Sequence, residues 1–264
     1  MKNWKMYLLI LACVLFAGCA KTVSISHSGG QPQGFWSGHP RPDNGSDPAF
    51  DYRGELSEFD VLGITRGEIT SEAEIRRAFE NAKPVRLRRG SSILLIQSGA
   101  LFPDGPMVTE LSKHFKVVPF SGVPSLRKAG GIVQTESLDP ESYSRSLRLT
   151  AAHGGNDVIV CYWGILESEN ERLATKTVSW VPVVNWILPD EVQHMRIRLK
   201  LALIDVRSGN WTVFSPQAFD SNRISTRPKR GAAEQKQVEH LKEKAYQAGV
   251  KALVSAHADL AMAE

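Results

Sequence analysis

The stretch Ser91-Ser92-Ile93-Leu94-Leu95-Ile96-Gln97 decides the fold class of this chain. Its four central residues form a continuous apolar run of strand length, bounded by Gly90 and Gly99. Such a run indicates a strand that is buried on both faces, because a half-exposed strand alternates apolar and polar residues. Residues 91–97 are therefore predicted to form the central strand of a sheet that is covered on both sides.

The sequence after this strand predicts a βαβ unit. Apolar residues share one face of a helix over residues 107–115, and a strand follows over 116–120. The expected connection between the two parallel strands is a right-handed crossover.

Two further helices are predicted on either side of this unit. Ser71 and Glu74 have the spacing of a capping box, and the helix that follows over 72–82 carries an apolar stripe of Ala73, Ile75, Ala78 and Phe79. The other helix begins after the N-cap Asp139 and runs to residue 153, before Gly154-Gly155. Gly155 is expected to supply the left-handed helix end.

From residue 156 onward the pattern changes to long strands, predicted over 157–167, 172–183 and 195–203. In the last of these every odd residue is apolar, which is typical of a half-exposed antiparallel strand. The remaining elements are predicted as a turn at 208–210, a strand over 211–219, a polar loop and a helix over 232–263, broken or kinked near Gly249. The predicted fold is a three-layer α/β domain. Its mixed sheet is parallel in the βαβ unit and antiparallel after residue 156, and the chain ends in a long helix.

The amino-terminal stretch Leu15-Phe16-Ala17-Gly18-Cys19 indicates where the protein is placed. Two lysines and a short apolar segment precede the small pair Ala17-Gly18, which is the order of parts in a signal peptide. With Cys next, the stretch resembles the lipobox of bacterial lipoproteins, which implies that Cys19 becomes the diacylated first residue. In the sorting rule of Gram-negative lipoproteins, Ala20 in place of Asp implies the outer membrane, with the domain facing the periplasm.

Three parts of the chain are predicted: a signal peptide over 1–18, a flexible tether over 19–49 and a single α/β domain over 50–264. The tether is rich in Gly, Pro, Ser, Asn and Gln, a composition that cannot bury enough apolar surface to order a chain. About 25 such residues span roughly 25 to 30 Å, so the domain is expected to stand off the bilayer.

This order of parts resembles the curli-secretion (CsgG-like) lipoproteins and the envelope lipoproteins that share the fold of the amino-terminal domain of TolB. In that group a helix ends in Gly-Ala-Asp, similar to Gly155-Asn156-Asp157, and the last hairpin carries Asp-Val-Arg-Thr-Gly, similar to Asp205-Val206-Arg207-Ser208-Gly209. The resemblance covers roughly residues 91–264. Its motifs are structural, so it implies a fold and no activity.

Charge argues against nucleic acid as a partner, and the cysteine content argues against a fold held by disulfides. The formal net charge of +4 falls to +2 when the two lysines of the signal peptide leave, and a balance this small does not favour nucleic acid as a partner. Removal of the signal peptide also takes Cys13, so that beside the lipidated Cys19 only Cys161 is left and no intramolecular disulfide can form. Because Cys161 lies in an apolar run, it is predicted to be buried and structural.

The sequence contains no motif for catalysis. Its seven His residues form no HExxH motif or Cys/His cluster, and GxSxG is missing, so no catalytic residue, metal ligand or cofactor is predicted. The best candidate for a ligand site is the loop after the central strand, because α/β sheets bind ligands at that edge. Its residues are Ser98, Gly99, Asp104 and Gly105, and a plain connection between strand and helix is the alternative.

The apolar insert over 178–189 is predicted to contact a partner or the membrane if it is exposed, and to pack on its own sheet otherwise. The candidate contacts are Trp180, Val181, Val184, Trp186 and Ile187. The predicted function is a non-enzymatic interaction or accessory component of the cell envelope, with the membrane and unidentified envelope proteins as partners. The alternatives are a subunit of an oligomeric secretion assembly, which would bind copies of itself, and an unrecognised periplasmic hydrolase.

Overall fold

The structure is a computed structural model that describes residues 21–28, 54–65, 67, 70–124, 126–129, 132–135, 139–172, 191–225 and 230–259. Its elements in chain order are β1 (Lys21–Ser24), α2 (Ile25–Ser28), α3 (Glu58–Leu62), α4 (Glu72–Asn81), β2 (Leu87–Arg88), β3 (Ser92–Gln97), α5 (Gly105–Ser112), β4 (Lys116–Phe120), β5 (Leu126–Ala129), β6 (Ile132–Thr135), α6 (Pro140–His153), β7 (Val158–Arg172), β8 (Glu191–Asp205), β9 (Trp211–Phe214), β10 (Phe219–Ser225), α7 (Arg230–His257) and β11 (Ala258–Asp259).

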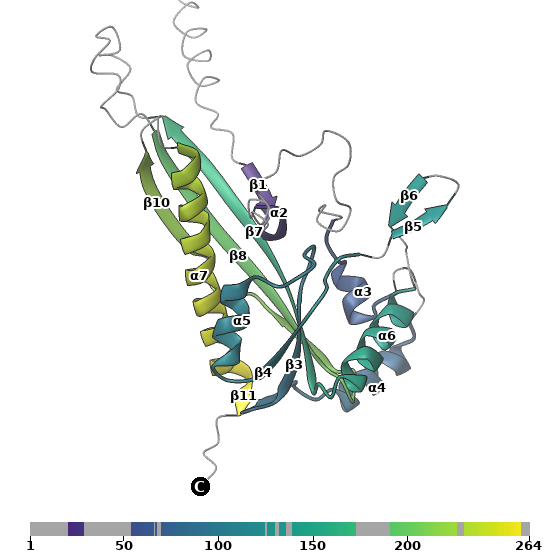
Figure 1. Cartoon of the computed structure of the whole chain (residues 1–264). Helices are drawn as coiled ribbons and strands as arrows, with labels where there is room; N and C mark the ends of the chain where they lie inside the picture. The colour runs from purple at the N-terminus through teal and green to yellow at the C-terminus, as the bar shows by residue number, and fades with distance from the viewer. Residues whose placement is uncertain are drawn as a thin grey trace, which may run out of the picture.

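A mixed sheet of seven strands forms the middle layer of the domain (Figure 1). Its path is β10-β8-β7-β3-β4, with β1 on β7 and β9 on β8. β3 pairs in parallel with β4 and β7, and the pairs made by β8 are antiparallel. The predicted βαβ unit and mixed sheet are therefore confirmed. β3 is an interior strand next to the edge strand β4, and β7 lies at the centre of the path, so the prediction of β3 as the central strand is wrong. Two small sheets, β5–β6 and β2–β11, lie outside it.

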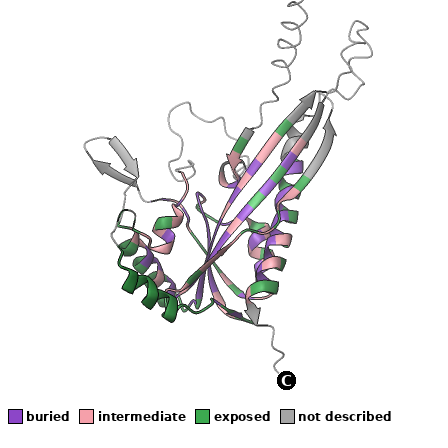
Figure 2. Cartoon of the chain, turned by 180° about the vertical axis from the view of Figure 1, so that it is seen from behind, coloured by how far each residue is buried: buried purple, intermediate pink, exposed green. Residues whose placement is uncertain are grey.

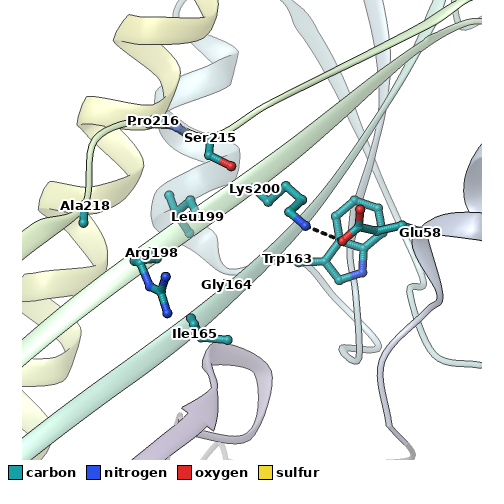
Figure 3. Close-up of a pocket in the computed structure, with 10 residues that line it drawn as sticks. All are labelled: Glu58, Trp163, Gly164, Ile165, Arg198, Leu199, Lys200, Ser215, Pro216 and Ala218. Carbon is teal, nitrogen blue, oxygen red and sulfur yellow. Dashed lines mark hydrogen bonds and ion pairs between the residues drawn. The ribbon is translucent and has the colours of Figure 1, made fainter.

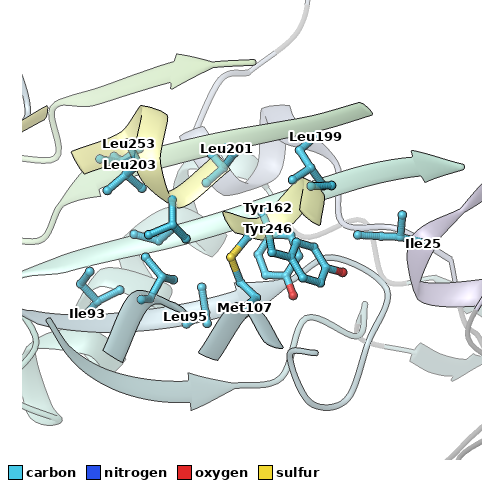
Figure 4. Packing of buried hydrophobic residues seen from close by; sticks show 14 of the residues in the cluster. Ile25, Ile93, Leu95, Met107, Tyr162, Leu199, Leu201, Leu203, Tyr246 and Leu253 are labelled. Carbon is cyan, nitrogen blue, oxygen red and sulfur yellow. The ribbon is translucent and has the colours of Figure 1, made fainter. Parts of the chain in front are cut away.

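Helices cover both faces of this sheet, as predicted for a three-layer domain. Alternate residues of β3 enter two separate cores, because successive side chains of a strand point to opposite faces. Ile93 and Leu95 pack with α5 and α7, whereas Leu94 and Ile96 pack with α3 and α6. Figure 4 shows the first and larger core, in which Tyr162 and Tyr246 lie side by side.

The helix ends follow the local signals in the sequence. Ser71 Oγ accepts a hydrogen bond from the backbone N–H of Glu74, and the Glu74 carboxylate accepts one from the backbone N–H of Ser71, which completes the capping box. The Asp139 carboxylate caps α6 by accepting from the N–H of Ser142. Gly155 has φ 68°, the left-handed conformation expected after α6.

One predicted helix forms without joining the core. The apolar stripe of α4 is typical of a helix that packs on a sheet, but no residue of α4 is buried (Figure 2). Ile75 is 51% exposed and Phe79 is 84% exposed. The reason is that α3 and α6, which pack on each other, already cover that face of the sheet.

The strand predicted over 211–219 is two strands with different positions on β8. β9 pairs with residues 201–204 of β8, and β10 pairs with residues 191–197. Pro216 lies between them, where its missing N–H cannot join a ladder. β10 extends to Ser225 and so includes residues predicted as loop. The strand predicted over 172–183 lies outside the described residues, except for Arg172 at the end of β7.

The terminal helix is shorter than predicted and is not broken. α7 ends at His257 and passes through Gly249 without interruption. Gly249 contacts β8, since a Cβ atom there would lie 3.3 Å from Leu199 Cδ1. This glycine lets the helix approach the strand closely and does not end the helix.

The start of the predicted tether belongs to the domain. Residues 21–28 form β1 and α2, β1 pairs with β7, and Ile25 is 1% exposed within the larger core. The composition of residues 19–49 is typical of a tether, but Val23 in β1 and Ile25 at the start of α2 both pack in the larger core. Residues 29–53 lie outside the described part of the chain.

Candidate functional site

The predicted ligand loop lies at the expected edge of the sheet, but its polar groups bind other protein groups. Ser98 is buried, and its Oγ accepts a hydrogen bond from Leu56 N at 2.8 Å. Its carbonyl oxygen accepts from Ser26 Oγ at 2.6 Å. Gly99 has φ 78° and turns the chain, and Gly105 is the first residue of α5.

Asp104, the N-cap residue of α5, is the centre of a polar network that joins β3, β7 and α7 to the start of α5. Its carboxylate accepts hydrogen bonds from Lys242 Nζ at 3.0 Å and from Tyr246 OH at 2.5 Å. Its backbone N–H donates to Gln97 Oε1 at 2.7 Å, and Tyr162 OH donates to the same oxygen at 2.5 Å. We call Gln97, Asp104, Tyr162, Lys242 and Tyr246 the Asp104 network.

The tyrosine hydroxyls of the Asp104 network do not release their protons easily. Burial raises the pKa of Tyr162 and of Tyr246 well above the usual value, and the nearby Asp104 charge raises both further. Both hydroxyls therefore stay protonated at neutral pH and act as hydrogen-bond donors. The network is suited to joining the helices to the sheet and poorly suited to proton transfer.

Sequence reasoning found Asp104 but missed the other members of this network. In the sequence, Tyr162 and Tyr246 have the pattern of ordinary core residues. They are far apart in the chain, so the sequence does not indicate that they are in contact. Two weak signals are present in the sequence: Gln97 ends an otherwise apolar strand, and Lys242 follows Leu241 on the buried side of α7.

A surface pocket of about 380 Å³ lies over the middle of the β7–β8 hairpin (Figure 3). On one edge of this hairpin β7 changes partner from β3 to β1, and on the other edge β8 changes partner from β9 to β10. The pocket lies where both changes occur. We call it the sheet pocket, lined by Glu58, Trp163, Gly164, Ile165, Arg198, Leu199, Lys200, Ser215, Pro216 and Ala218.

The charges of the sheet pocket are held in pairs. Lys200 Nζ lies 2.5 Å from Glu58 Oε1, and Arg198 is paired with Glu167. Trp163 is held in place, because its indole N–H donates to the carbonyl oxygen of Leu56 at 2.8 Å. The surface left for a ligand is mainly apolar. The sequence predicts only a half-exposed strand here, over residues 195–203, and no pocket.

Other predicted site residues lie outside the described part of the chain. These are Cys19 and the five insert residues Trp180, Val181, Val184, Trp186 and Ile187. The strand ends that flank residues 173–190 are described, and β7 and β8 pair up to these ends, from Val158↔Asp205 to Arg172↔Glu191. Among the described residues, no group of His, Cys, Asp or Glu side chains has the arrangement of a metal site.

Cys161 is buried in the smaller core, as predicted, and burial raises the pKa of its thiol well above the usual value. Since the thiolate is the reactive form, we expect no labelling by a bulky maleimide at neutral pH in the native state and full labelling in denaturant. Mass spectrometry of the native protein checks this. Ser146→Cys, at an exposed position of α6, is the matched control and should label at once. Equal rates at the two positions would contradict burial.

Comparison with known proteins gives one family. The family model described as YafT bacterial lipoprotein matches residues 57–256, more than half of the 264 residues. The match supports a bacterial lipoprotein and gives no support to the predicted resemblance to curli-secretion or TolB-like proteins. A search of the curated proteins finds no match. Within the described residues, none of the helices combines the length and the apolar character needed to cross a membrane.

Proposed function

Because this chain belongs to the YafT bacterial lipoprotein family, we propose that it is an outer-membrane lipoprotein that acts as a non-enzymatic interaction component of the cell envelope. The anchor is the lipidated Cys19, and the domain faces the periplasm. The lipobox ahead of Cys19 and Ala20 directly after it support this placement. A small net charge fits a protein or lipid partner better than a polyanion.

The observation that carries the binding role is the sheet pocket. Its volume of about 380 Å³ falls within the range of about 300–1,000 Å³ typical of ligand pockets. Trp163 and Ile165 offer apolar surface, while the cations beside them are already paired. We therefore expect the pocket to accept an apolar side chain from an envelope protein, since buried aromatic contacts dominate many protein interfaces.

The Asp104 network supports the non-enzymatic part of the proposal. An enzyme needs titratable groups that can reach a substrate, but the groups at this sheet edge are bound to one another. The two tyrosines are fully buried, with raised pKa values.

A photocrosslinking amino acid at Ser215, on the rim of the sheet pocket, is expected to capture a discrete partner in living cells. Ala218→Trp in the same chain should abolish the crosslink by filling the pocket. The same amino acid at Ser146, on an exposed face of α6, is the matched control site. A crosslink that survives Ala218→Trp, or that appears equally from position 146, would contradict binding in the pocket.

Cys19→Ser is expected to move the protein from the membrane fraction to the soluble fraction. Lipid chains at one residue supply the anchoring, because each buried CH₂ contributes about 0.8 kcal/mol and two chains hold a protein stably. Cell fractionation with detection of the protein measures this. Cys161→Ala should leave the protein in the membrane fraction and is the matched control. If the Cys19→Ser protein stays wholly in the membrane fraction, Cys19 is not the anchor.

A further inference from the structure

The residues that directly follow the lipidation site are built into the sheet. β1 pairs antiparallel with β7, from Lys21↔Ser168 to Ser24↔Ile165. Only Ala20 separates Cys19 from the first residue of this strand. Consecutive Cα atoms lie about 3.8 Å apart, so that the Cα atom of Lys21 lies within about 7.6 Å of the Cα atom of Cys19.

The contacts of Ile25 hold this amino-terminal segment on the domain. The Ile25 side chain fills the space left by Gly164, where a Cβ atom would lie 2.5 Å from Ile25 Cδ1. The carbonyl oxygen of Ile25 accepts a hydrogen bond from Lys242 Nζ at 2.8 Å. Ser26 Oγ accepts from Gln97 Nε2 at 3.0 Å. The segment is therefore tied to β3, β7 and α7 at once.

The pairing of β1 with β7 determines the end of the sheet at which the lipid anchor lies. Because the two strands are antiparallel, the chain before Lys21 points toward the end of β7 at Arg172 and the start of β8 at Glu191. Figure 1 shows β1 near this end of the long hairpin and α4 at the opposite end of the domain. Figure 2, seen from behind, shows the same arrangement.

We propose that the lipidated protein lies with the β1 end of its sheet directly against the bilayer, in one fixed orientation. The partner of this end is the lipid leaflet that holds the acyl chains of Cys19. The exposed apolar stripe of α4 then faces away from that membrane. The inference rests on the lipid anchor of the proposed function, and it replaces a domain free on a long tether by a domain seated on the membrane surface.

The test uses the full mature lipidated protein in vesicles of phosphatidylethanolamine and phosphatidylglycerol that contain a lipid with a nitroxide on its headgroup. A fluorophore is attached to a single exposed cysteine, introduced as Glu169→Cys at the β1 end or as Glu72→Cys at the start of α4. We expect loss of most of the fluorescence at position 169 and no loss at position 72. Unsubstituted protein, whose Cys161 is buried, controls for background labelling.

A flexible insertion distinguishes a domain that is held against the membrane from one that is only attached to it through the lipid. Ten Gly and Ser residues between Ala20 and Lys21 have a root-mean-square span of about 17 Å and leave both Cys19 and β1 unchanged. Position 169 should then recover its fluorescence while the protein stays on the vesicles. Equal quenching at positions 169 and 72, or quenching at 169 that the insertion does not change, would overturn the proposed orientation.

Cys19→Ser in the same assay separates this inference from the proposed function. Release of that variant from the vesicles, together with equal quenching at the two positions in the lipidated protein, would leave the anchor intact and refute the orientation alone. Retention of the Cys19→Ser protein on the vesicles would refute the anchor, and with it the basis of the orientation.

Discussion

Gly122→Ala is expected to lower the free energy of unfolding by about 3 kcal/mol or more, at the upper end of the cost of overpacking a core. A Cβ atom at this position would lie 1.9 Å from the carbonyl oxygen of Gln97 and 2.6 Å from its carbonyl carbon. Backbone cannot rotate away as a side chain does. The backbone of Gly122 also exchanges hydrogen bonds of 2.9 Å with Gly99 and Ala100, so the segment is held against the end of β3.

Gly105→Ala is the matched control for this substitution. Gly105 lies in the same region, at the first position of α5, and a Cβ atom there meets nothing within 4 Å. Replacing an unstrained glycine by alanine typically stabilises a protein by about 0.4–1 kcal/mol. Urea unfolding followed by circular dichroism measures both variants. Similar midpoints for the two would show that the region around Gly122 can move, contrary to this prediction.

Asp104→Ala is expected to cost about 3 kcal/mol of stability, because it leaves a buried ammonium group without its counter-charge. Lys242 is 9% exposed and reaches Asp104 at 3.0 Å. Its other described hydrogen bond is to the carbonyl oxygen of Ile25, which carries no full charge. Tyr246 OH also loses its acceptor.

Replacing the other partner of this ion pair, by Lys242→Met, is expected to cost less stability, about 1–2 kcal/mol. Asp104 is 27% exposed, so its carboxylate keeps contact with water and with Tyr246, and Met fills much of the volume of Lys. Thermal unfolding of both variants measures the difference. Glu141→Ala, which removes an exposed ion pair with Arg145, is the control and should change the melting temperature little. A larger loss for Lys242→Met than for Asp104→Ala would contradict this account.

Elements whose signals lie within a few residues could be predicted from the sequence. The apolar run of β3 indicated burial on both faces, and Asp139 and Gly155 marked the ends of α6. The turn before β9 follows the same rule, because the Asp205 carboxylate accepts hydrogen bonds from Ser208 N and Ser208 Oγ. In each case the partners are neighbours in the chain, so that residue type and spacing are sufficient.

The candidate sites could be predicted only in part. The loop after β3 lies at the predicted edge of the sheet, since strand direction alone places it there, and its role as a ligand site stays a prediction. The Asp104 network depends on residues far apart in the chain, such as Gln97 and Tyr246, and no spacing rule connects them. The sheet pocket depends on where β1 and β10 end along the hairpin, which is a matter of register between distant strands.

The sequence by itself determined the lipobox, the alternation of helices and strands in the βαβ unit and the burial of β3, because periodicity and capping act within single elements. Only the tertiary structure decided which apolar surfaces were covered. The stripe of α4 has the pattern of a core helix and stays exposed, since α3 and α6 already occupy that face. Ile25 lies in a polar, glycine-rich stretch and is buried, since Gly164 leaves space for it on the other side of the sheet.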